Sequence, residues 1–413
     1  MTSSFATWLV TAFAAVAAVA AASAPTAIRR EQAASPPTSA AKSRPVTRST
    51  ATPRTSPEFD TLAAAAHAAR EGGRLEEAAA LYGKAIQLRP AWTEGKWYLG
   101  TTFYEMERYT DARVAFRAVT AAQPTNGPAY GMKGICEFRL KDYESALSDL
   151  MTAEQLGLGG NQQLEGSIRY HAGIIMTRLG QYEFALLQLY WLAQRGNDSP
   201  RVMEAFGLAA LRIPMLPEEL STDRREMVML AGQGAYFQAA QLNSRAEPAF
   251  EQLVNRYADT PNVHYAFALF LLGENPDRAM EEFRSELKVS PGHVPALLQI
   301  AFEYIKRSEW HAAEPWARQA VENAPTDAVA HRALGQVFLE LGDVPGAIQQ
   351  LEMGLELSPD SPSLHFVLAR AYQKAGRSAD ARRHRLEFER LQRETRTAQF
   401  GEQAVGGAGR RSP

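Results

Sequence analysis

The chain has 413 residues, of which 46% are hydrophobic and 22% are charged, so it is too apolar to be disordered throughout. Its formal net charge of −2 is uneven, with +5 over residues 1–57, +1 over residues 397–413 and −8 over the body between them. An acidic body excludes nucleic acid as the main partner, because phosphate binding needs a basic face. The single cysteine, Cys136, excludes an internal disulfide framework and a cysteine-based zinc site.

The chain opens with an uncharged apolar stretch over residues 5–24, which is typical of an export signal. Small residues at Ala18, Ala20 and Ala22 offer cleavage patterns, so the sequence predicts a signal peptide over residues 1–22. The stretch is also long enough for a membrane anchor that is never cleaved, and this alternative stays open. Either interpretation predicts a protein of the periplasm, the cell envelope or the exterior, with membrane contact only through this segment.

Residues 23–57 are rich in proline, serine, threonine and alanine and contain no aromatic residue. Such a segment buries too little apolar surface to offset the entropy of ordering it. We therefore expect a disordered linker.

A period of 34 residues governs the body of the chain. It separates alanines in two series: Ala78, Ala112, Ala146 and then Ala279, Ala313, Ala347, Ala381. Prolines keep the same period at Pro90, Pro124, Pro291, Pro325 and Pro359. Within each period, apolar residues at helical spacing are followed by a short turn and a second helical pattern that stops at the proline, which cannot continue a helix. Small alanines let the second helix approach the first closely.

This pattern resembles the tetratricopeptide repeat (TPR) family. The signature positions are held in one repeat by Leu99, Gly100, Phe103, Ala112, Phe116 and Pro124, and in a later one by Leu334, Gly335, Phe338, Ala347 and Pro359. The chain is similar to exported bacterial members of that family. The resemblance implies an all-α fold, a right-handed superhelical solenoid of stacked helix-turn-helix repeats, and a role in protein–protein interaction.

The period also predicts the domain organisation. An N-terminal TPR block covers residues 58–200, degenerate repeats and a joint cover residues 201–259, and a C-terminal TPR block with an Arg-rich capping helix covers residues 260–396. Pro214 and Pro217 interrupt any continuous helix in the joint, which is either a hinge or an eroded repeat. Residues 397–413 are expected to form a disordered tail.

Positions 2, 5, 9, 12 and 13 of each first helix lie opposite the signature residues, and in a stacked solenoid they line the concave surface. The candidate peptide-binding residues at these positions are Trp97, Tyr104, Phe138, Arg139, Tyr170, Arg178, Phe302, Arg332 and Arg370. The aromatic rings would anchor apolar side chains of a partner, and Arg332 and Arg370 would pair a carboxylate. The alternative is that the rings pack as ordinary core.

No arrangement of residues predicts catalysis or a cofactor. His331 and His365 occupy the same position of adjacent repeats, but two histidines without a third ligand do not make a metal site. The sequence therefore predicts a non-catalytic scaffold that binds protein or peptide partners in the cell envelope. The alternative is an accessory assembly subunit of an envelope machine for secretion, pilus formation or polysaccharide export.

Overall fold

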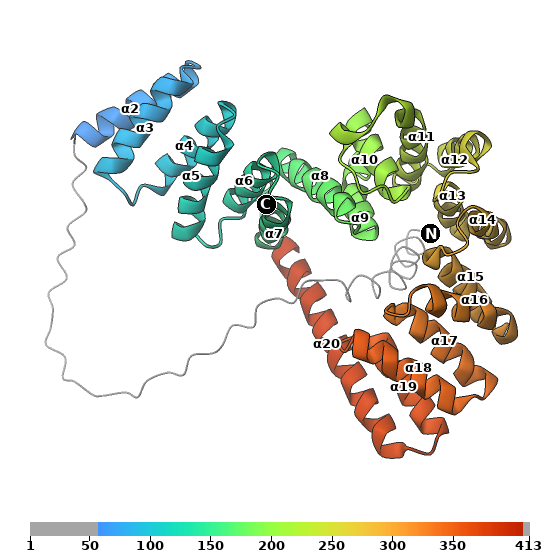
Figure 1. Cartoon of the computed structure of the whole chain (residues 1–413). Coiled ribbons are helices and arrows are strands. Elements are labelled where there is room, and N and C mark those ends of the chain that lie inside the picture. Colours follow the sequence, from blue (N-terminus) through green and yellow to red (C-terminus); the bar gives the residue numbers. More distant parts are fainter. Residues whose placement is uncertain (1–56, 408–413) are drawn as a thin grey trace, which may run out of the picture. The chain divides into compact units, whose positions relative to one another are not determined.

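The computed structural model describes residues 57–407, with side chains described as far as Glu394 (Figure 1). The predicted signal segment 1–22 and all of the linker except Pro57 lie outside the described residues. Within residues 57–407 the structure contains nineteen α-helices, one short 3-10 helix and no strand. None of these helices combines the length and the apolar character needed to cross a lipid bilayer.

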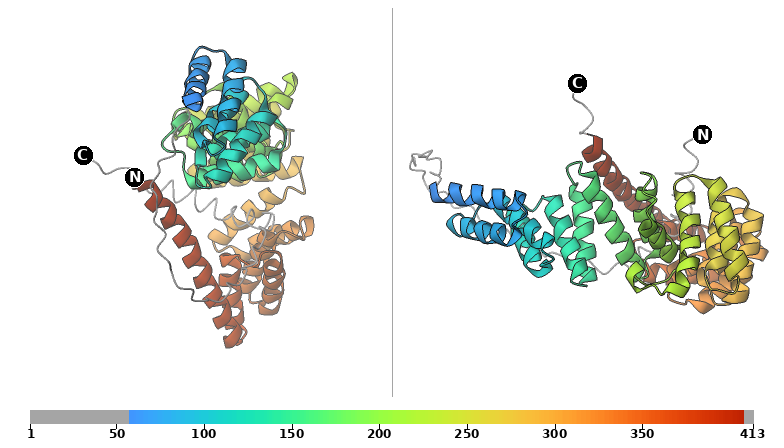
Figure 2. Two further views of the ribbon diagram at one scale, coloured as in Figure 1. Left: turned by 90° about the vertical axis from the view of Figure 1, so that its left-hand side faces the viewer. Right: turned by 90° about the horizontal axis from the view of Figure 1, so that it is seen from above.

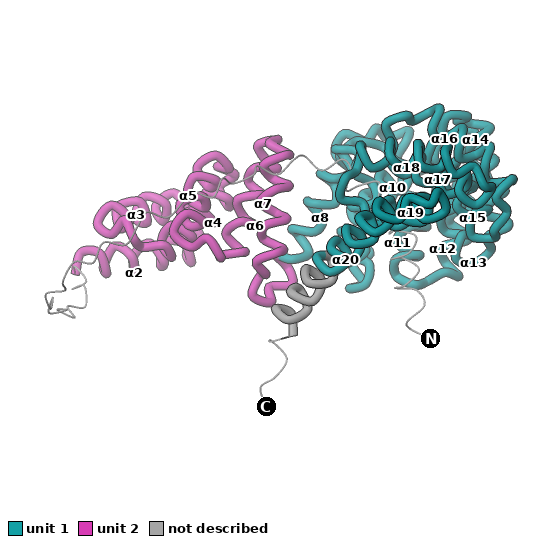
Figure 3. Tube along the Cα trace, turned by 90° about the horizontal axis from the view of Figure 1, so that it is seen from below, with its two compact units in different colours: residues 1–24, 165–413 teal, residues 25–164 magenta. Residues whose placement is uncertain are grey.

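The described helices divide into two compact units, whose boundary falls inside α8 (Figure 3). The N-terminal unit, residues 57–164, contains α2 (Pro57–Glu71), α3 (Leu75–Leu88), α4 (Thr93–Glu105), α5 (Tyr109–Ala122), α6 (Gly127–Arg139) and α7 (Tyr143–Leu156). The C-terminal unit starts at residue 165 and contains α8 (Gln162–Arg178), α9 (Tyr182–Ala193), α10 (Pro200–Ala210), η1 (Pro217–Glu219), α11 (Thr222–Ala239), α12 (Asn243–Tyr257), α13 (Val263–Glu274), α14 (Pro276–Val289), α15 (Val294–Lys306), α16 (Trp310–Asn323), α17 (Ala328–Leu341), α18 (Val344–Leu357), α19 (Pro362–Lys374) and α20 (Ser378–Gly407).

Within each unit, consecutive helices pack side by side as hairpins, as Figures 1 and 2 show. First helices begin 34 residues apart, at Thr93 and Gly127 in the N-terminal unit and at Val294, Ala328 and Pro362 in the C-terminal unit, so they keep the period of the alanines and prolines. The fold is therefore an all-α solenoid of helix-turn-helix repeats, as the sequence predicts.

The periodic alanines lie where the two helices of a repeat cross. All seven are fully buried. On the facing helix, small residues are needed as well: a Cβ added to Gly100 would lie 2.9 Å from the Phe116 ring, and one added to Gly335 would lie 2.6 Å from Leu351. Close approach of the two backbones therefore depends on the absence of larger side chains at both positions.

The periodic prolines set the end of each second helix. Helices α3, α5, α14, α16 and α18 all end two residues before a proline. The intervening residue leaves the helical conformation in every case, as at Gln123, with φ −133° and ψ 80°, and Ser358, with φ −141° and ψ 79°. The proline ring disfavours helical backbone at the residue before it, so each repeat ends at the same place.

The turn inside each repeat contains a residue in the left-handed conformation, which also recurs at 34-residue intervals. In the N-terminal unit these residues are Gly73, Glu107 and Lys141, and in the C-terminal unit they include Ser308, Gly342 and Gly376. Hydrogen bonds close the helix end around them, such as Arg108 N–H to Phe103 O at 2.9 Å. Half of these positions are not glycine, so the sequence gives little sign of the turn.

The joint at residues 201–259 consists of packed helices. Helices α10 and α11 approach so closely that a Cβ on Gly232 would lie 1.8 Å from the Met203 carbonyl oxygen, and one on Gly207 would lie 1.9 Å from that of Val228. Arg212, partly buried just after the end of α10, forms an ion pair with Glu183 of α9. Backbone contact therefore packs the two helices of the joint against each other, and the ion pair fastens the end of α10 to α9.

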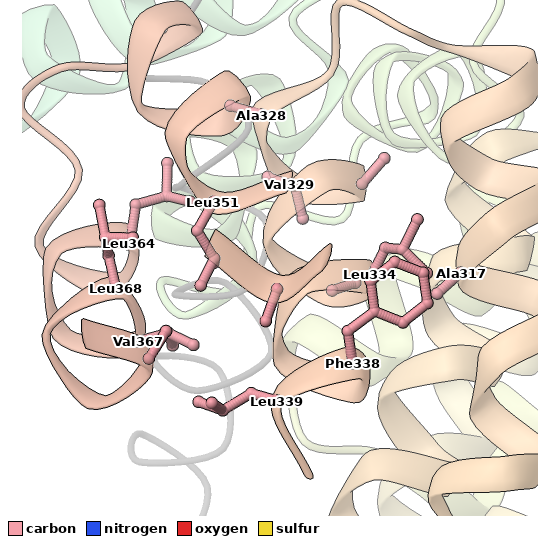
Figure 4. Packing of buried hydrophobic residues seen from close by; sticks show 14 of the residues in the cluster. Ala317, Ala328, Val329, Leu334, Phe338, Leu339, Leu351, Leu364, Val367 and Leu368 are labelled. Atoms are coloured by element: carbon pink, nitrogen blue, oxygen red, sulfur yellow. The ribbon is translucent and has the colours of Figure 1, made fainter. Parts of the chain in front are cut away.

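Figure 4 shows part of the core of the C-terminal unit, where α15 to α19 contribute buried alanine, leucine and valine side chains around Leu351 and Phe338. Helix α20 is the second helix of the last repeat, and it has 30 residues against 13 in α19. It continues to Gly407, past residue 397 at which the sequence predicts the tail to begin. No proline interrupts this segment, and a helix that has started extends at little cost.

Candidate functional site

The candidate residues lie on what we call the first-helix face, meaning positions 2, 5, 9, 12 and 13 of the first helix of a repeat. The structure divides them between the two units. Trp97, Tyr104, Phe138 and Arg139 belong to the N-terminal unit, and the other five belong to the C-terminal unit. Each set is therefore considered by itself.

In the N-terminal unit, Trp97 and Tyr104 of α4 are both partly exposed. The Trp97 ring packs edge-on against Phe116, with 5.4 Å between ring centroids, and Tyr104 contacts Tyr109 at 5.6 Å. These neighbours fix the orientation of both rings while one side of each stays open to solvent. A role for Trp97 and Tyr104 in binding apolar partner groups stays a prediction.

Two of the five candidate aromatic residues are buried, as the alternative of ordinary core packing predicts, whereas Trp97, Tyr104 and Phe302 are partly exposed. Phe138 is 7% exposed and lies against Tyr143 of its own repeat, with ring centroids 5.9 Å apart. Tyr170 is 9% exposed, and the guanidinium of Arg201 lies 5.5 Å from its ring centre. Both side chains fill contacts between helices, so they support the fold more than they present a surface.

Two of the candidate arginines are exposed but engaged to different degrees. Arg139 lies at 6.0 Å from the ring centres of Tyr109 and Phe138. Arg178 donates to the Pro214 carbonyl oxygen at 2.9 Å and lies 3.5 Å from the Glu219 carboxylate. Arg178 thus holds the proline-containing segment of the joint on α8.

In the C-terminal unit, Arg332 of α17 lies over the Phe302 ring of α15, with 5.0 Å between the guanidinium carbon and the ring centre. Its Nε atom is buried without a hydrogen-bond partner, and no carboxylate among the described residues forms an ion pair with it. Burial lowers the pKa of Arg332 to about 10, and the charge of Asp327 offsets part of that effect. Arg332 therefore remains a cation at neutral pH; the Asp327 charge acts on it, but no carboxylate among the described residues forms an ion pair with it.

Arg370 differs from Arg332 because it already has a partner. It forms an ion pair with Glu340 of the preceding repeat. Lys374 of the same helix lies 3.9 Å from the second oxygen of Glu340 and donates to the Leu339 carbonyl at 3.0 Å. Helices α17 and α19 are joined by this group, so the charge of Arg370 is already balanced by Glu340, although its side chain is 42% exposed.

The histidines singled out in the sequence do not pair with each other. His331 contacts Gln350 of α18, and His365 contacts His384 of α20. Sequence reasoning missed His384, although it lies 34 residues after Gln350 and so occupies the same repeat position. Among the described residues, no group of three histidine, cysteine, aspartate or glutamate side chains could hold a metal ion.

Helices α6 and α7 enclose a group of buried charges. Glu137 is 6% exposed and Asp149 is 8% exposed, and Lys133 lies 2.7 Å from the Asp149 carboxylate. Burial and the neighbouring Asp149 carboxyl raise the pKa of Glu137. Burial also raises the pKa of the adjacent Cys136 thiol to about 12, so this cysteine is protonated and a poor nucleophile at neutral pH.

The chain is similar to several proteins of known structure or function. It is 25% identical over 252 residues to BBSome complex member BBS4 of Mus musculus, an alignment that covers 53% of this chain and 43% of that protein. The chain thus matches less than half the length of this relative. It resembles the structure of MamA from Desulfovibrio magneticus RS-1, at 19% identity with a TM-score of 0.38, over 41% of this chain and 96% of MamA. It also resembles the Cut9–Hcn1 structure of the APC/C, at 14% identity with a TM-score of 0.35, over 82% of this chain and 87% of that one.

Family models match both ends of the described region. A tetratricopeptide repeat model matches residues 63–126 and 98–157, and the model of the middle TPR-like domain of cilia and flagella-associated protein 70 matches residues 227–392. These matches agree with the 34-residue period, the buried alanines and the proline-limited helix pairs. The chain therefore belongs to the tetratricopeptide repeat family, whose members are helical scaffolds for protein–protein interaction.

Proposed function

We propose that the protein is a non-catalytic scaffold of the cell envelope, and that its C-terminal unit binds a peptide segment carrying an apolar side chain next to a carboxylate. The observation that supports the binding site is the position of the Arg332 guanidinium above the Phe302 ring, with its buried Nε atom lacking a hydrogen-bond partner. A buried N–H donor without a hydrogen-bond partner costs free energy, which a bound anion that accepts from the guanidinium recovers. The planar guanidinium suits a carboxylate, which it can bind through two parallel hydrogen bonds.

The surroundings of Arg332 favour a ligand that is partly apolar. Phe302 and Ile305 of α15 are partly exposed, and Leu298 lies beneath them with 5% exposure. Lys306, one turn further along the same helix, has a side chain that is 69% exposed and lies 3.4 Å from the Glu303 carboxylate, so its ammonium group is open to solvent but already has an acidic neighbour. An apolar group against Phe302 and a carboxylate on Arg332 would use both features together.

Binding is best tested with a library of short peptides, each in free-acid and C-terminally amidated forms, presented to the full chain. We expect the library to enrich peptides with an apolar residue beside Asp, Glu or a free C-terminus. Arg332→Gln should weaken their binding about tenfold or more, since a hydrogen bond to a charged group contributes roughly 1.5–3 kcal/mol. Arg332→Lys should recover only part of the affinity, because lysine lacks the planar fork.

Lys288→Gln is the matched control, because it removes an exposed charge from the second helix α14, away from the first-helix face. Thermal unfolding followed by circular dichroism checks that each variant keeps its helices. Equal binding by the parent and a folded Arg332→Gln variant would refute the assigned site. If the parent and every variant instead recover the same partner in fixed stoichiometry, the result would favour the accessory-subunit function.

The envelope location has its own test. An epitope-tagged full chain should fractionate with the periplasm or the membrane of its host, and recovery in the cytoplasmic fraction would contradict this part of the proposal. The location test is independent of the peptide-binding test, so the proposed location and the proposed binding site can be refuted separately.

A further inference from the structure

Two consecutive repeats hold a histidine at the same position of the first helix, and both rings are anchored in the same way. The Nε2 atom of His331 lies 2.9 Å from the Pro325 carbonyl oxygen, and that of His365 lies 2.9 Å from the Pro359 carbonyl oxygen. A carbonyl oxygen can only accept, so Nε2 carries the hydrogen in both rings. The state of each histidine is therefore decided at its other nitrogen, Nδ1.

The two repeats differ in what Nδ1 contacts. In His331 it lies 2.8 Å from the side-chain amide of Gln350, whereas in His365 it lies 2.8 Å from Nδ1 of His384. A glutamine amide can turn either its oxygen or its NH2 group toward the ring, so it suits a neutral and a protonated histidine equally. Two facing imidazole nitrogens form a hydrogen bond only when a single hydrogen lies between them.

The surroundings of His384 decide where that hydrogen resides. Since neutral His365 has its hydrogen on Nε2, the shared hydrogen belongs to His384, whose own Nε2 is then bare. That bare nitrogen lies 3.5 Å from the Arg383 guanidinium, which can donate to it. The His384 ring is 6% exposed and stacks on Tyr372, with 5.4 Å between ring centres.

Charged groups of both signs surround the pair. Those that face it are Glu352 of α18, which accepts a hydrogen bond from Tyr372, the cations Arg377 and Arg383, and the carboxylates Asp380 and Glu387 of α20. Burial, followed by His365 and Arg383, lowers the pKa of His384, although Asp380 and Glu352 oppose the shift. Because the pKa of His384 is lower in the folded chain, the His365–His384 contact contributes its full stability above the pKa of an unfolded histidine, near 6.5. Its contribution decreases as the pH falls below that value.

We propose that the His365–His384 contact is an acid-sensitive latch, which holds α20 on α19 while at most one ring is protonated and releases α20 when both are. With both rings protonated, two N–H groups and two positive charges would face each other at 2.8 Å. Helix α20 makes its extensive contacts with α19, so its release leaves the other repeats intact. The partner of His331, in contrast, can adapt its amide.

The latch can be tested by hydrogen–deuterium exchange of the full chain between pH 7.5 and 4.5, with rates corrected for the intrinsic effect of pH. Protection of residues 378–394 should fall by about tenfold or more below pH 6.5, since linkage of one proton changes an equilibrium tenfold per pH unit. Residues 344–357, which form α18, serve as the internal reference and should change much less. An equal fall in both segments would overturn the proposal.

The chain itself supplies the matched variants. His384→Gln copies the pairing of Gln350 and should make the protection of α20 nearly independent of pH. Gln350→His places the histidine pair in the preceding repeat and should make α18 acid-sensitive, a result that does not depend on how well His384→Gln folds. Parent-like pH profiles in both variants would show that the pair is not the latch.

Discussion

The close contact between α10 and α11 gives the sharpest test of how the solenoid is packed. Alanine at Gly232 would place its Cβ 1.8 Å from the Met203 carbonyl oxygen, and alanine at Gly207 would place it 1.9 Å from that of Val228. Ordinary C···O contacts are about 3.3–3.6 Å, so the helices would have to separate by roughly 1.5 Å. Overpacking of this kind costs about 1–3 kcal/mol or more, partly offset by the gain of about 0.5–1 kcal/mol on replacing glycine in a helix.

Gly83→Ala is the matched control, because an added Cβ in α3 meets no atom within 4 Å. It should stabilise the chain by about 0.5–1 kcal/mol, whereas Gly207→Ala and Gly232→Ala should each destabilise it by about 1–2 kcal/mol. Urea unfolding followed by circular dichroism measures the change, and hydrogen exchange over residues 200–239 shows whether it is local, since repeats can unfold separately. Midpoints at or above that of the parent for both glycine variants would refute this account of the joint.

Two further changes test the turns and the buried carboxyl group. Replacing Glu107 or Ser308, which have φ of 57° and 60°, by glycine should raise the free energy of unfolding by up to about 1 kcal/mol, measured by urea unfolding; a loss of stability would contradict the proposed strain in these turns. Because the pKa of Glu137 is raised in the folded chain, this residue contributes its full stabilisation below its unfolded pKa near 4.5. The stabilisation is lost as the pH rises through the folded pKa, by up to about 1.4 kcal/mol of unfolding free energy per pH unit. Glu137→Gln should therefore flatten the dependence of the urea midpoint between pH 5 and 9, and an unchanged slope would show that another group is responsible.

The repeat boundaries could be predicted from the sequence because two residue types carry them. Small residues such as Ala112 mark where helices cross, and prolines such as Pro124 mark where they end; both effects are local and steric. The turns were not predictable in the same way, since Glu107, Lys141 and Ser308 adopt a conformation that glycine usually signals. The contacts that close the helix ends hold these residues in place despite the local cost.

For the candidate site, the sequence predicts only which residues lie on the first-helix face. Helical geometry puts Phe138 and Trp97 on the same side of a first helix, but it does not show which ring a neighbouring side chain covers. The unpartnered Nε atom of Arg332 and the pairing of Arg370 with Glu340 likewise depend on contacts between repeats. The close packing of α10 on α11 could not be predicted from the repeat pattern, because Gly207 and Gly232 are not separated by the repeat period.

The repeated alanine and proline positions also affect how the length of such a solenoid can change during evolution. Residues 294–327 form one complete period with the same small and helix-ending positions as the period that follows. Because each such unit contacts chiefly its neighbours, a duplication or loss of whole units preserves the contacts on either side. The regular part of the chain can therefore lengthen or shorten in steps of one gene segment, whereas the glycine-packed pair α10–α11 and the terminal helix α20 have no equivalent unit to replace them.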